Sequence, residues 1–137
     1  MLDKNKQIVR RFYNEIVNQA NSDVIEEIVA SNFNDHSGPK TSTGIKPLKE
    51  FLTMFGGAFP EGHVDVKDLV AEDDMVAARI SVTGTHKGNL LGTIPATGKQ
   101  AMWSGIDIFR IQNNKIVERW NERDLLGLMQ QLGVVPK

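Results

Sequence analysis

The spacing of the hydrophobic residues changes once along this chain, and that change constrains the fold more than any other feature. Up to Pro60 the apolar residues recur every three to four positions, which is typical of amphipathic helices. After Pro60 they alternate with polar residues, which is typical of half-buried strands. We therefore expect helices over residues 3–17, 24–29 and 47–59, strands over 64–70, 76–85, 100–111 and 115–123, and a last helix over 124–132.

This order of elements predicts the fold class. Helices followed by a run of strands favour an α+β fold with an antiparallel meander over a parallel α/β sheet. Asn113 and Asn114, between the last two strand segments, are a hairpin turn signal. The helices must then cover one face of a curved sheet, and the space between helices and sheet is the natural ligand site. A length of 137 residues fits one domain over residues 1–137.

Composition excludes several classes of function. The chain contains no cysteine, which rules out disulfides, thiolate metal sites and a cysteine nucleophile. Its formal net charge is −1 and no basic stripe is present, so nucleic acid is not an expected partner. The apolar runs are too short to span a membrane, and the N-terminus lacks the apolar core of a signal peptide. We expect a cytoplasmic protein that does not act at membranes.

Five segments of the second half of the chain resemble a known family. They are VTGTHKG (82–88), LGTIPATGK (91–99), GIDIFRI (105–111), KIVERW (115–120) and LLGLMQQLG (125–133). Each is short, but in this order and spacing they resemble the SnoaL-like polyketide cyclases, or ester cyclases, of the nuclear transport factor 2-like superfamily.

That resemblance implies both a fold and an activity. The fold is a cone-shaped, curved antiparallel sheet wrapped around N-terminal helices, a cystatin-like α+β barrel. The characterised cyclases close a ring in an aromatic polyketide ester by intramolecular aldol condensation, using an acidic side chain and neither a metal nor an organic cofactor. The implied ligand is a small hydrophobic carbonyl compound, and the open convex sheets of the superfamily commonly pack into homodimers. The same fold also hosts isomerases, hydrolases and plain binding proteins.

Two positions of the family site fall on polar residues here. The catalytic acid of the cyclases falls on Asn121, whose amide can polarise a carbonyl but cannot act as a base. A second position, often histidine in the cyclases, falls on Asp107 within an apolar strand. Apolar neighbours would make Asp107 a stronger base, as removal of a proton next to a carbonyl requires. An ion pair with Arg79 or Arg119, or hydrogen bonds from the backbone, would instead keep it an unreactive carboxylate.

Strand parity predicts which of these side chains meet. Asp107 shares a face with Trp103 and Gly105, and Asn121 shares a face with Arg119. If both faces point into the cone, Asp107, Arg119 and Asn121 converge there, and Gly105 leaves room beside Asp107 for a ligand. Trp103 is then either a flat wall of the pocket or ordinary core.

The remaining candidates are less tightly defined. His36 follows an aromatic-acidic segment. In many relatives a histidine after a similar segment faces the cavity, which is one interpretation of His36. The alternative is an exposed loop residue. We also expect Arg79, Leu91, Ile94 and Phe55 to contact the ligand. Asp124 precedes the last helical segment, so it is more simply an N-cap than a substitute acid. No histidine spacing indicates a metal site.

Two classes of function remain. The first is a cofactor-independent enzyme in which Asp107 is the base, with His36, Asn121 and Arg79 or Arg119 stabilising an enolate. Within it, an isomerase or hydrolase of the same fold is an alternative to a cyclase. The second is a small-ligand binder without catalysis, which Asn121 favours because the family's acid is missing at that position.

Overall fold

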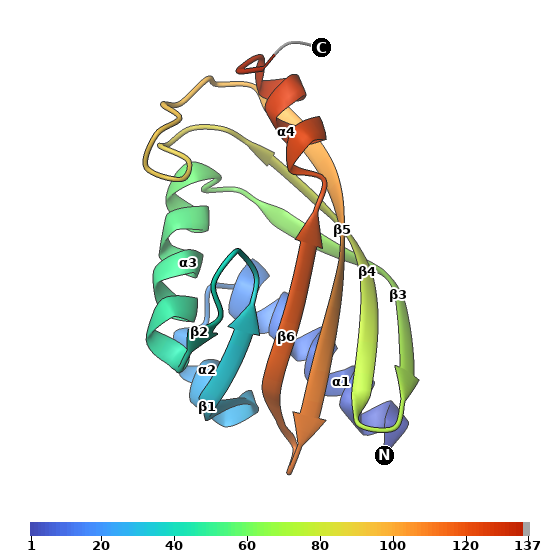
Figure 1. Cartoon of the computed structure of the whole chain (residues 1–137). Coiled ribbons are helices and arrows are strands. Elements are labelled where there is room, and N and C mark those ends of the chain that lie inside the picture. Colours follow the sequence, from blue (N-terminus) through green and yellow to red (C-terminus); the bar gives the residue numbers. More distant parts are fainter. Residues whose placement is uncertain (136–137) are drawn as a thin grey trace.

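The computed structural model describes residues 1–135, and its elements follow the expected order of helices and then strands, except that two strands lie within the helical half. The first helices are α1 (Leu2–Arg11), the π-helix η1 (Phe12–Asn18), the 3-10 helix η2 (Ser22–Val24) and α2 (Ile25–Ile28). Strands β1 (Val29–His36) and β2 (Ser42–Thr43) precede α3 (Ile45–Ala58). The meander consists of β3 (His63–Glu72), β4 (Met75–Thr85), β5 (Gln100–Gln112) and β6 (Lys115–Arg123), followed by α4 (Leu125–Leu132). The expected α+β class is confirmed (Figure 1).

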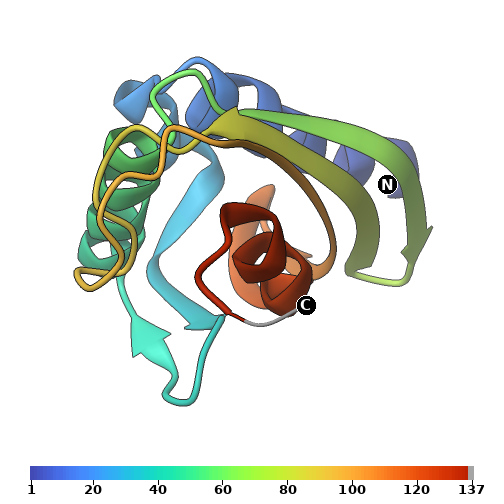
Figure 2. The same cartoon turned by 90° about the horizontal axis from the view of Figure 1, so that it is seen from above.

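The strands form one curved, unclosed sheet in the order β2-β1-β6-β5-β4-β3. Each neighbouring pair from β3 to β6 is antiparallel, whereas β1 runs parallel to β6. Seen from above, the sheet curves round one side of the molecule, α1 and α3 lie along the other side, and α4 lies over the near end (Figure 2). The interior of this cone is the space between the helices and the concave face of the sheet.

The alternation of β5 follows the sequence pattern closely. Ala101, Trp103, Gly105, Asp107, Phe109 and Ile111 are buried, and nearly all the residues between them are exposed. The turn after β5 places Asn113 at φ 53° and Asn114 at φ 62°, in the left-handed region that asparagine tolerates better than most residues. The hairpin expected at this turn is therefore confirmed. A register shift between Arg110 and Ile111 then brings Asn121 opposite Asp107.

The last helix is bounded as its sequence indicates. Asp124 is the N-cap of α4, because its Oδ1 accepts a hydrogen bond of 2.9 Å from the backbone N–H of Gly127. Gly133 ends the helix in the left-handed conformation, at φ 76°. The capping interpretation of Asp124 is confirmed. No helix within residues 1–135 is long and apolar enough to cross a membrane.

The π-helix η1 brings two aromatic side chains into the core. It continues α1 without a break, but each of its turns holds more residues than an α-helical turn. The rings of Phe12, Tyr13 and Phe109 meet edge to face, with centroids 5.4 to 5.7 Å apart, which is a favourable aromatic geometry. Tyr13 is thereby held against Phe109 of β5, although these two residues are far apart in the sequence.

Candidate functional site

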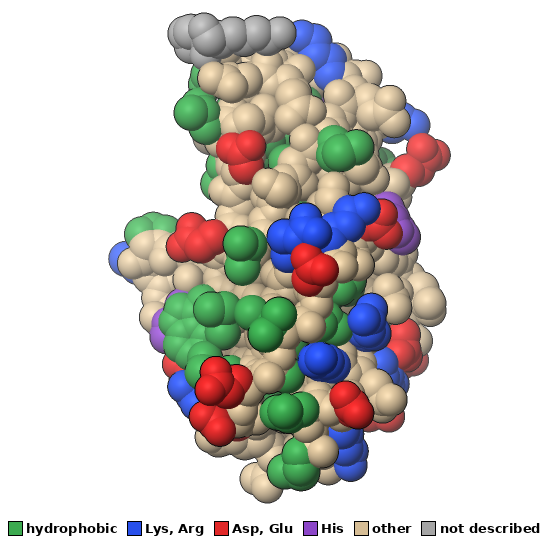
Figure 3. All heavy atoms as spheres, turned by 90° about the vertical axis from the view of Figure 1, so that its right-hand side faces the viewer, with side chains coloured by type: hydrophobic (Ala, Val, Ile, Leu, Met, Phe, Trp, Pro, Cys, Tyr) green, Lys and Arg blue, Asp and Glu red, His purple; other side chains and the backbone are tan. Residues whose placement is uncertain are grey.

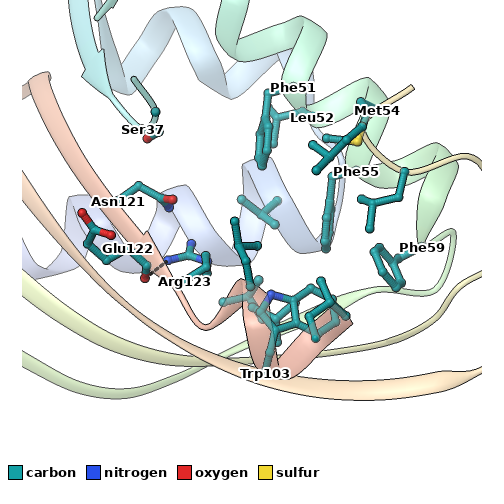
Figure 4. A pocket seen from close by; sticks show the side chains of 18 of the residues that line it. Ser37, Phe51, Leu52, Met54, Phe55, Phe59, Trp103, Asn121, Glu122 and Arg123 are labelled. Carbon is teal, nitrogen blue, oxygen red and sulfur yellow. Dashed lines mark hydrogen bonds between the residues drawn. The ribbon is translucent and has the colours of Figure 1, made fainter. Parts of the chain in front are cut away.

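A cavity of about 490 Å³ lies between the helices and the sheet, within the size range of small-molecule sites. Figure 4 shows its two contrasting sides: aromatic and aliphatic side chains of α3 on one, and polar side chains of β6 on the other. The polar residues around it are Tyr13, His36, Ser37, Arg119, Asn121, Glu122 and Arg123. The cavity therefore has one wall for an apolar ring system and one for oxygen atoms.

The apolar wall is a row of aromatic rings. Phe51 and Phe55 of α3 and its C-cap residue Phe59 follow one another at four-residue spacing, with ring centroids 6.5 and 5.7 Å apart. Trp103 of β5 continues the row, with its ring centroid 5.0 Å from that of Phe59. We call these four residues the aromatic row. Trp103 is buried and also lines the cavity, so both interpretations of it from the sequence hold together. Flat rings in such a row favour stacking with a planar ligand.

A buried carboxylate lies behind the polar wall and does not itself line the cavity. Asp107 has no exposed surface and accepts hydrogen bonds from Arg123 Nη1 at 2.6 Å, Arg123 Nη2 at 3.0 Å and Asn121 Nδ2 at 2.8 Å. The hydroxyl of Tyr13 donates the fourth. We call Tyr13, Asp107, Asn121 and Arg123 the Asp107 cluster. Each carboxylate oxygen accepts two bonds, so the lone-pair positions of the carboxylate are all filled.

The ion-pair partner of Asp107 differs from both expected arginines. Asn121 lies directly opposite Asp107 in the β5–β6 register, and Arg123 lies opposite Gly105, one inward-facing position further on. A Cβ at position 105 would stand 2.5 Å from Arg123 Nη1, so the missing side chain lets the guanidinium lie across Gly105. The space beside Asp107 therefore holds Arg123, and the expectation that Gly105 leaves it open for a ligand is wrong.

Arg79 does not belong to the site. It is on the outward face of β4, its side chain is 58% exposed, and its Nε donates to Asp68 at 2.6 Å. Its neighbour Ala78 pairs with Asp107 and is buried. Since successive side chains of a strand point to opposite faces, Arg79 points outward. The expectation that Arg79 contacts either Asp107 or the ligand is corrected by this position.

Arg119 does face the cavity, but it is paired with a different carboxylate. Its Nη2 donates to Asp35 Oδ2 at 3.1 Å and to Ser37 Oγ at 3.2 Å, and its guanidinium lies 5.4 Å from the centre of the Phe12 ring. The parallel pairing of β1 with β6 sets Asp35 opposite Arg119. The expected convergence of Asp107, Arg119 and Asn121 on one face is observed, without a bond between Arg119 and Asp107.

His36 lines the cavity, but both of its ring nitrogens are held by residues outside it. Its Nε2 is 2.8 Å from Glu118 Oε2, its Nδ1 is 2.9 Å from Thr41 Oγ1, and the ring stacks on Trp120 at 5.1 Å. Those three partners are not among the residues that line the cavity. Because β1 pairs with β6, His36 follows the face of Trp120, which the sequence alone does not reveal.

The other expected ligand contacts divide between the wall and the core. Phe55 and Leu91 line the cavity, together with Trp103, Arg119 and Asn121. Ile94 does not: it packs against the core and its backbone pairs with that of Leu90, which lines the cavity in its place. The loop after β4 thus contributes Leu90 and Leu91 to the cavity, and the expected contact by Ile94 is corrected.

Two members of the Asp107 cluster were not expected from the sequence. Tyr13 lies in a helical apolar stripe and is indistinguishable there from a core aromatic; its hydroxyl is the only hint of a polar partner. Arg123 did carry a signal, because it shares parity with Asn121 and Arg119. Burial alone would lower the pKa of Arg123, but the hydrogen bonds and the charge of Asp107 outweigh burial and raise it. Arg123 is therefore a permanent cation.

Tyr13 is the single tyrosine of the chain. We expect it to stay un-ionised in the folded protein when the pH is raised through the range in which a free tyrosine side chain ionises. Burial, the negative charge of Asp107 and its hydrogen bond raise the pKa of Tyr13 well above 10.0. The unfolded chain ionises at about 10, so above that pH it binds fewer protons than the folded state, and the free energy of unfolding falls as the pH rises. Tyrosinate absorbance should appear together with loss of the circular dichroism of the fold. If tyrosinate formed in the folded protein at the pH where a free tyrosine ionises, about 10, the contact with Asp107 would be contradicted.

The sheet curves round the helices, and the cavity between them has one aromatic and one polar wall. Both features are typical of small-molecule-binding proteins with cone-shaped α+β folds. The family model of the SnoaL-like polyketide cyclases matches residues 7–132. The chain belongs to this family, and the resemblance drawn from its sequence segments is confirmed.

Individual relatives agree with this family. The aklanonic acid methyl ester cyclase DnrD of Streptomyces peucetius is 28% identical over 130 residues, which cover 92% of this chain and 88% of that protein. Among solved structures, TsrD from Streptomyces laurentii is 27% identical with a TM-score of 0.87, covering 97% of both chains. A protein of Bacillus cereus ATCC 10987 assigned as a polyketide cyclase is 30% identical with a TM-score of 0.82, covering 97% of this chain and 83% of its own.

Proposed function

We propose that this protein binds a hydrophobic carbonyl compound of the polyketide ester type and acts on it without a cofactor, by acid/base chemistry. One observation carries the proposal: the aromatic row faces a wall of hydrogen-bond donors across a cavity of about 490 Å³. A planar ring system fits the first wall and carbonyl oxygens fit the second. The similarity to two aklanonic acid methyl ester cyclases supports an ester as the ligand.

Arg119 is the proposed holder of a carbonyl oxygen. Its Nε and Nη2 are directed at Asp35 and Ser37, while its Nη1 has no hydrogen-bond partner within residues 1–135. The side chain is 4% exposed and its guanidinium is fixed by these contacts, so it is oriented before the ligand arrives. A fixed cationic donor stabilises the negative charge that develops on an enolate oxygen.

Asn121 is proposed to control the basicity of Asp107. Its amide donates to Oδ1 of Asp107 and also lines the cavity. Asp107 is buried behind this amide and does not line the cavity, so a ligand carbonyl has to displace the amide as it takes the amide hydrogen. The displacement frees one lone pair of Asp107, which can then accept the proton from the carbon next to that carbonyl. Tyr13 and Arg123 keep their bonds to the carboxylate and hold it in place. In this scheme Asp107 becomes a base only when the cavity is occupied.

A non-catalytic ligand-binding protein is the second candidate, and a specific observation favours it. The four hydrogen bonds to Asp107 leave it no free acceptor site before a ligand binds. Asn121 has no titratable group that could replace it. The two functions share the cavity and its ligand, and they differ in whether the bound ligand is turned over.

Thermal unfolding in the presence of candidate ligands tests the proposal. A ligand at a hundred times its dissociation constant adds about 2.7 kcal/mol, or roughly 3–6 °C of midpoint for a domain of this size. We expect polycyclic aromatic esters to raise the midpoint, and steroids, small lactones and simple ketones to have smaller effects. If none of these classes raises it, the proposal of a polyketide-type ligand is wrong.

We also propose that the protein is a cytoplasmic homodimer in which residues 1–137 act as one domain. The outward face of β5 exposes three apolar side chains: Met102 at 61%, Ile106 at 54% and Ile108 at 37%. Figure 3 shows hydrophobic side chains gathered in groups between charged ones on the side of the molecule that it views. An apolar strip on an open sheet face supports self-association. The molar mass measured by sedimentation equilibrium tests whether the protein is a dimer.

A further inference from the structure

A second cavity of about 410 Å³ lies on the other side of α3. It is bounded by η1 and η2, by the C-terminal half of α3 and by the segment that follows it. Four residues line both cavities: Val17, Leu52, Phe55 and Phe59. We call these four residues the partition, because their side chains border both spaces.

Two members of the partition have room to move. Phe59 is buried and packs closely on its neighbours: a Cβ at Gly84 would stand 3.0 Å from its ring. Leu52 and Phe55 are only partly buried, with open space on two sides. The Phe55 ring reaches Gly62 of the second cavity, since a Cβ there would stand 2.9 Å from its Cζ. Side chains bordered by open space lose few packing contacts when they rotate.

The second cavity offers little to a polar ligand. Asn18 is bound to the backbone of Val64 through both its amide oxygen and its amide nitrogen, at 2.8 and 2.9 Å. Lys49 pairs with Glu26 at 2.9 Å, and the Thr53 hydroxyl donates to a backbone carbonyl at 3.0 Å. With these groups already paired, Ser22 is the remaining polar side chain of the lining, and the rest of the surface left for a ligand is mainly apolar. Gly56 keeps part of this surface open, because nothing lies within 4 Å of the position its Cβ would take.

We propose that the second cavity is a subsite for an alkyl arm of the same ligand whose ring system lies on the aromatic row. The arm passes the partition where Leu52 and Phe55 rotate aside. This inference rests on the proposed function, since it extends the ligand that the main cavity holds. It makes the protein selective for esters or ketones with a linear apolar chain in addition to the rings.

Alkyl esters of anthraquinone-2-carboxylic acid, from methyl to hexyl, are the probe. We expect affinity in titration calorimetry to rise about fourfold for each added CH₂ that becomes buried. In the variant Gly56→Phe, the new ring occupies the second cavity, so the gain with chain length is expected to disappear while the methyl ester binds as before.

Gly57→Phe is the matched control. Gly57 adjoins Gly56 in α3 and its Cβ position is equally open, but it lines neither cavity. This variant should keep the full gain with chain length. If the methyl ester binds but longer esters bind no more tightly, or if both variants behave alike, the subsite is wrong and the proposed function stands. If no ester binds the wild-type protein, both are wrong.

Discussion

Replacing Arg123 by methionine is expected to lower the free energy of unfolding by about 3–5 kcal/mol, the range seen when one partner of a buried ion pair is removed. Asp107 is fully buried, and Arg123 supplies two of its four hydrogen bonds. Without the guanidinium the carboxylate remains as an uncompensated charge in the core, beside a Tyr13 hydroxyl that cannot neutralise it. For a domain whose total stability is typically about 5–15 kcal/mol, this loss brings the fold close to its limit.

Arg79→Met is the control for that experiment. Arg79 and Asp68 form an ion pair with a similarly short N–O distance of 2.6 Å, but both side chains are more than half exposed. Exposed pairs contribute about 0–1 kcal/mol, so this variant should unfold nearly like the wild type in urea. The double variant Asp107→Leu with Arg123→Met should recover part of the loss, since it removes both charges. Equal, small effects of Arg123→Met and Arg79→Met would contradict the buried ion pair.

Asp107→Asn is expected to reduce turnover of a polyketide-type ester by about 10²–10⁴-fold, the usual contribution of a general base, while ligand binding is largely retained. Asparagine keeps the size of the side chain and one acceptor oxygen for Arg123, but it removes the charge of the ion pair, so the variant is also expected to be less stable. It cannot take a proton from carbon. The measurement is single-turnover kinetics, with the ligand affinity and the unfolding midpoint of the variant determined in parallel.

Asp68→Asn is the matched carboxylate control, because Asp68 lies on the outer face and its loss should leave turnover unchanged. Three outcomes are distinct. Loss of turnover with retained binding supports Asp107 as the base. Undiminished turnover in a folded Asp107→Asn variant contradicts that role. Ligand binding without turnover in the wild type favours the ligand-binding protein over the enzyme.

Much of the fold follows from local sequence signals. The period-two pattern of residues 100–111 placed Asp107 on the buried face with Trp103, because parity along one strand needs no knowledge of its partners. The paired asparagines at 113 and 114 fixed a hairpin, and Asp124 with Gly133 marked the ends of the last helix. These features depend on residues close together in the chain.

The partners within the site could not be read in the same way. Arg123 reaches Asp107 only because position 105 lacks a side chain, which depends on the register between two strands. Tyr13 meets Asp107 across most of the chain, and His36 takes its face from a parallel pairing with β6. Long-range contacts of this kind are set by tertiary packing. Arg79 is different, since strand parity already placed it on the outward face.

The π-helix also limits where this chain can change in length. Residues 12–18 contain wider turns than an α-helix, so deleting one of them would let the segment continue α1 as regular α-helix. The wider turns carry the surplus residue, so this deletion leaves the parts on either side in the same orientation, whereas a deletion at Arg10 or Arg11 of α1 would turn them by about 100° relative to each other. Either Ile8 and Val9 would leave the core, or Tyr13 would leave Asp107. Insertions and longer deletions in this half of the molecule therefore belong in the turn around Ala20, where the backbone is exposed.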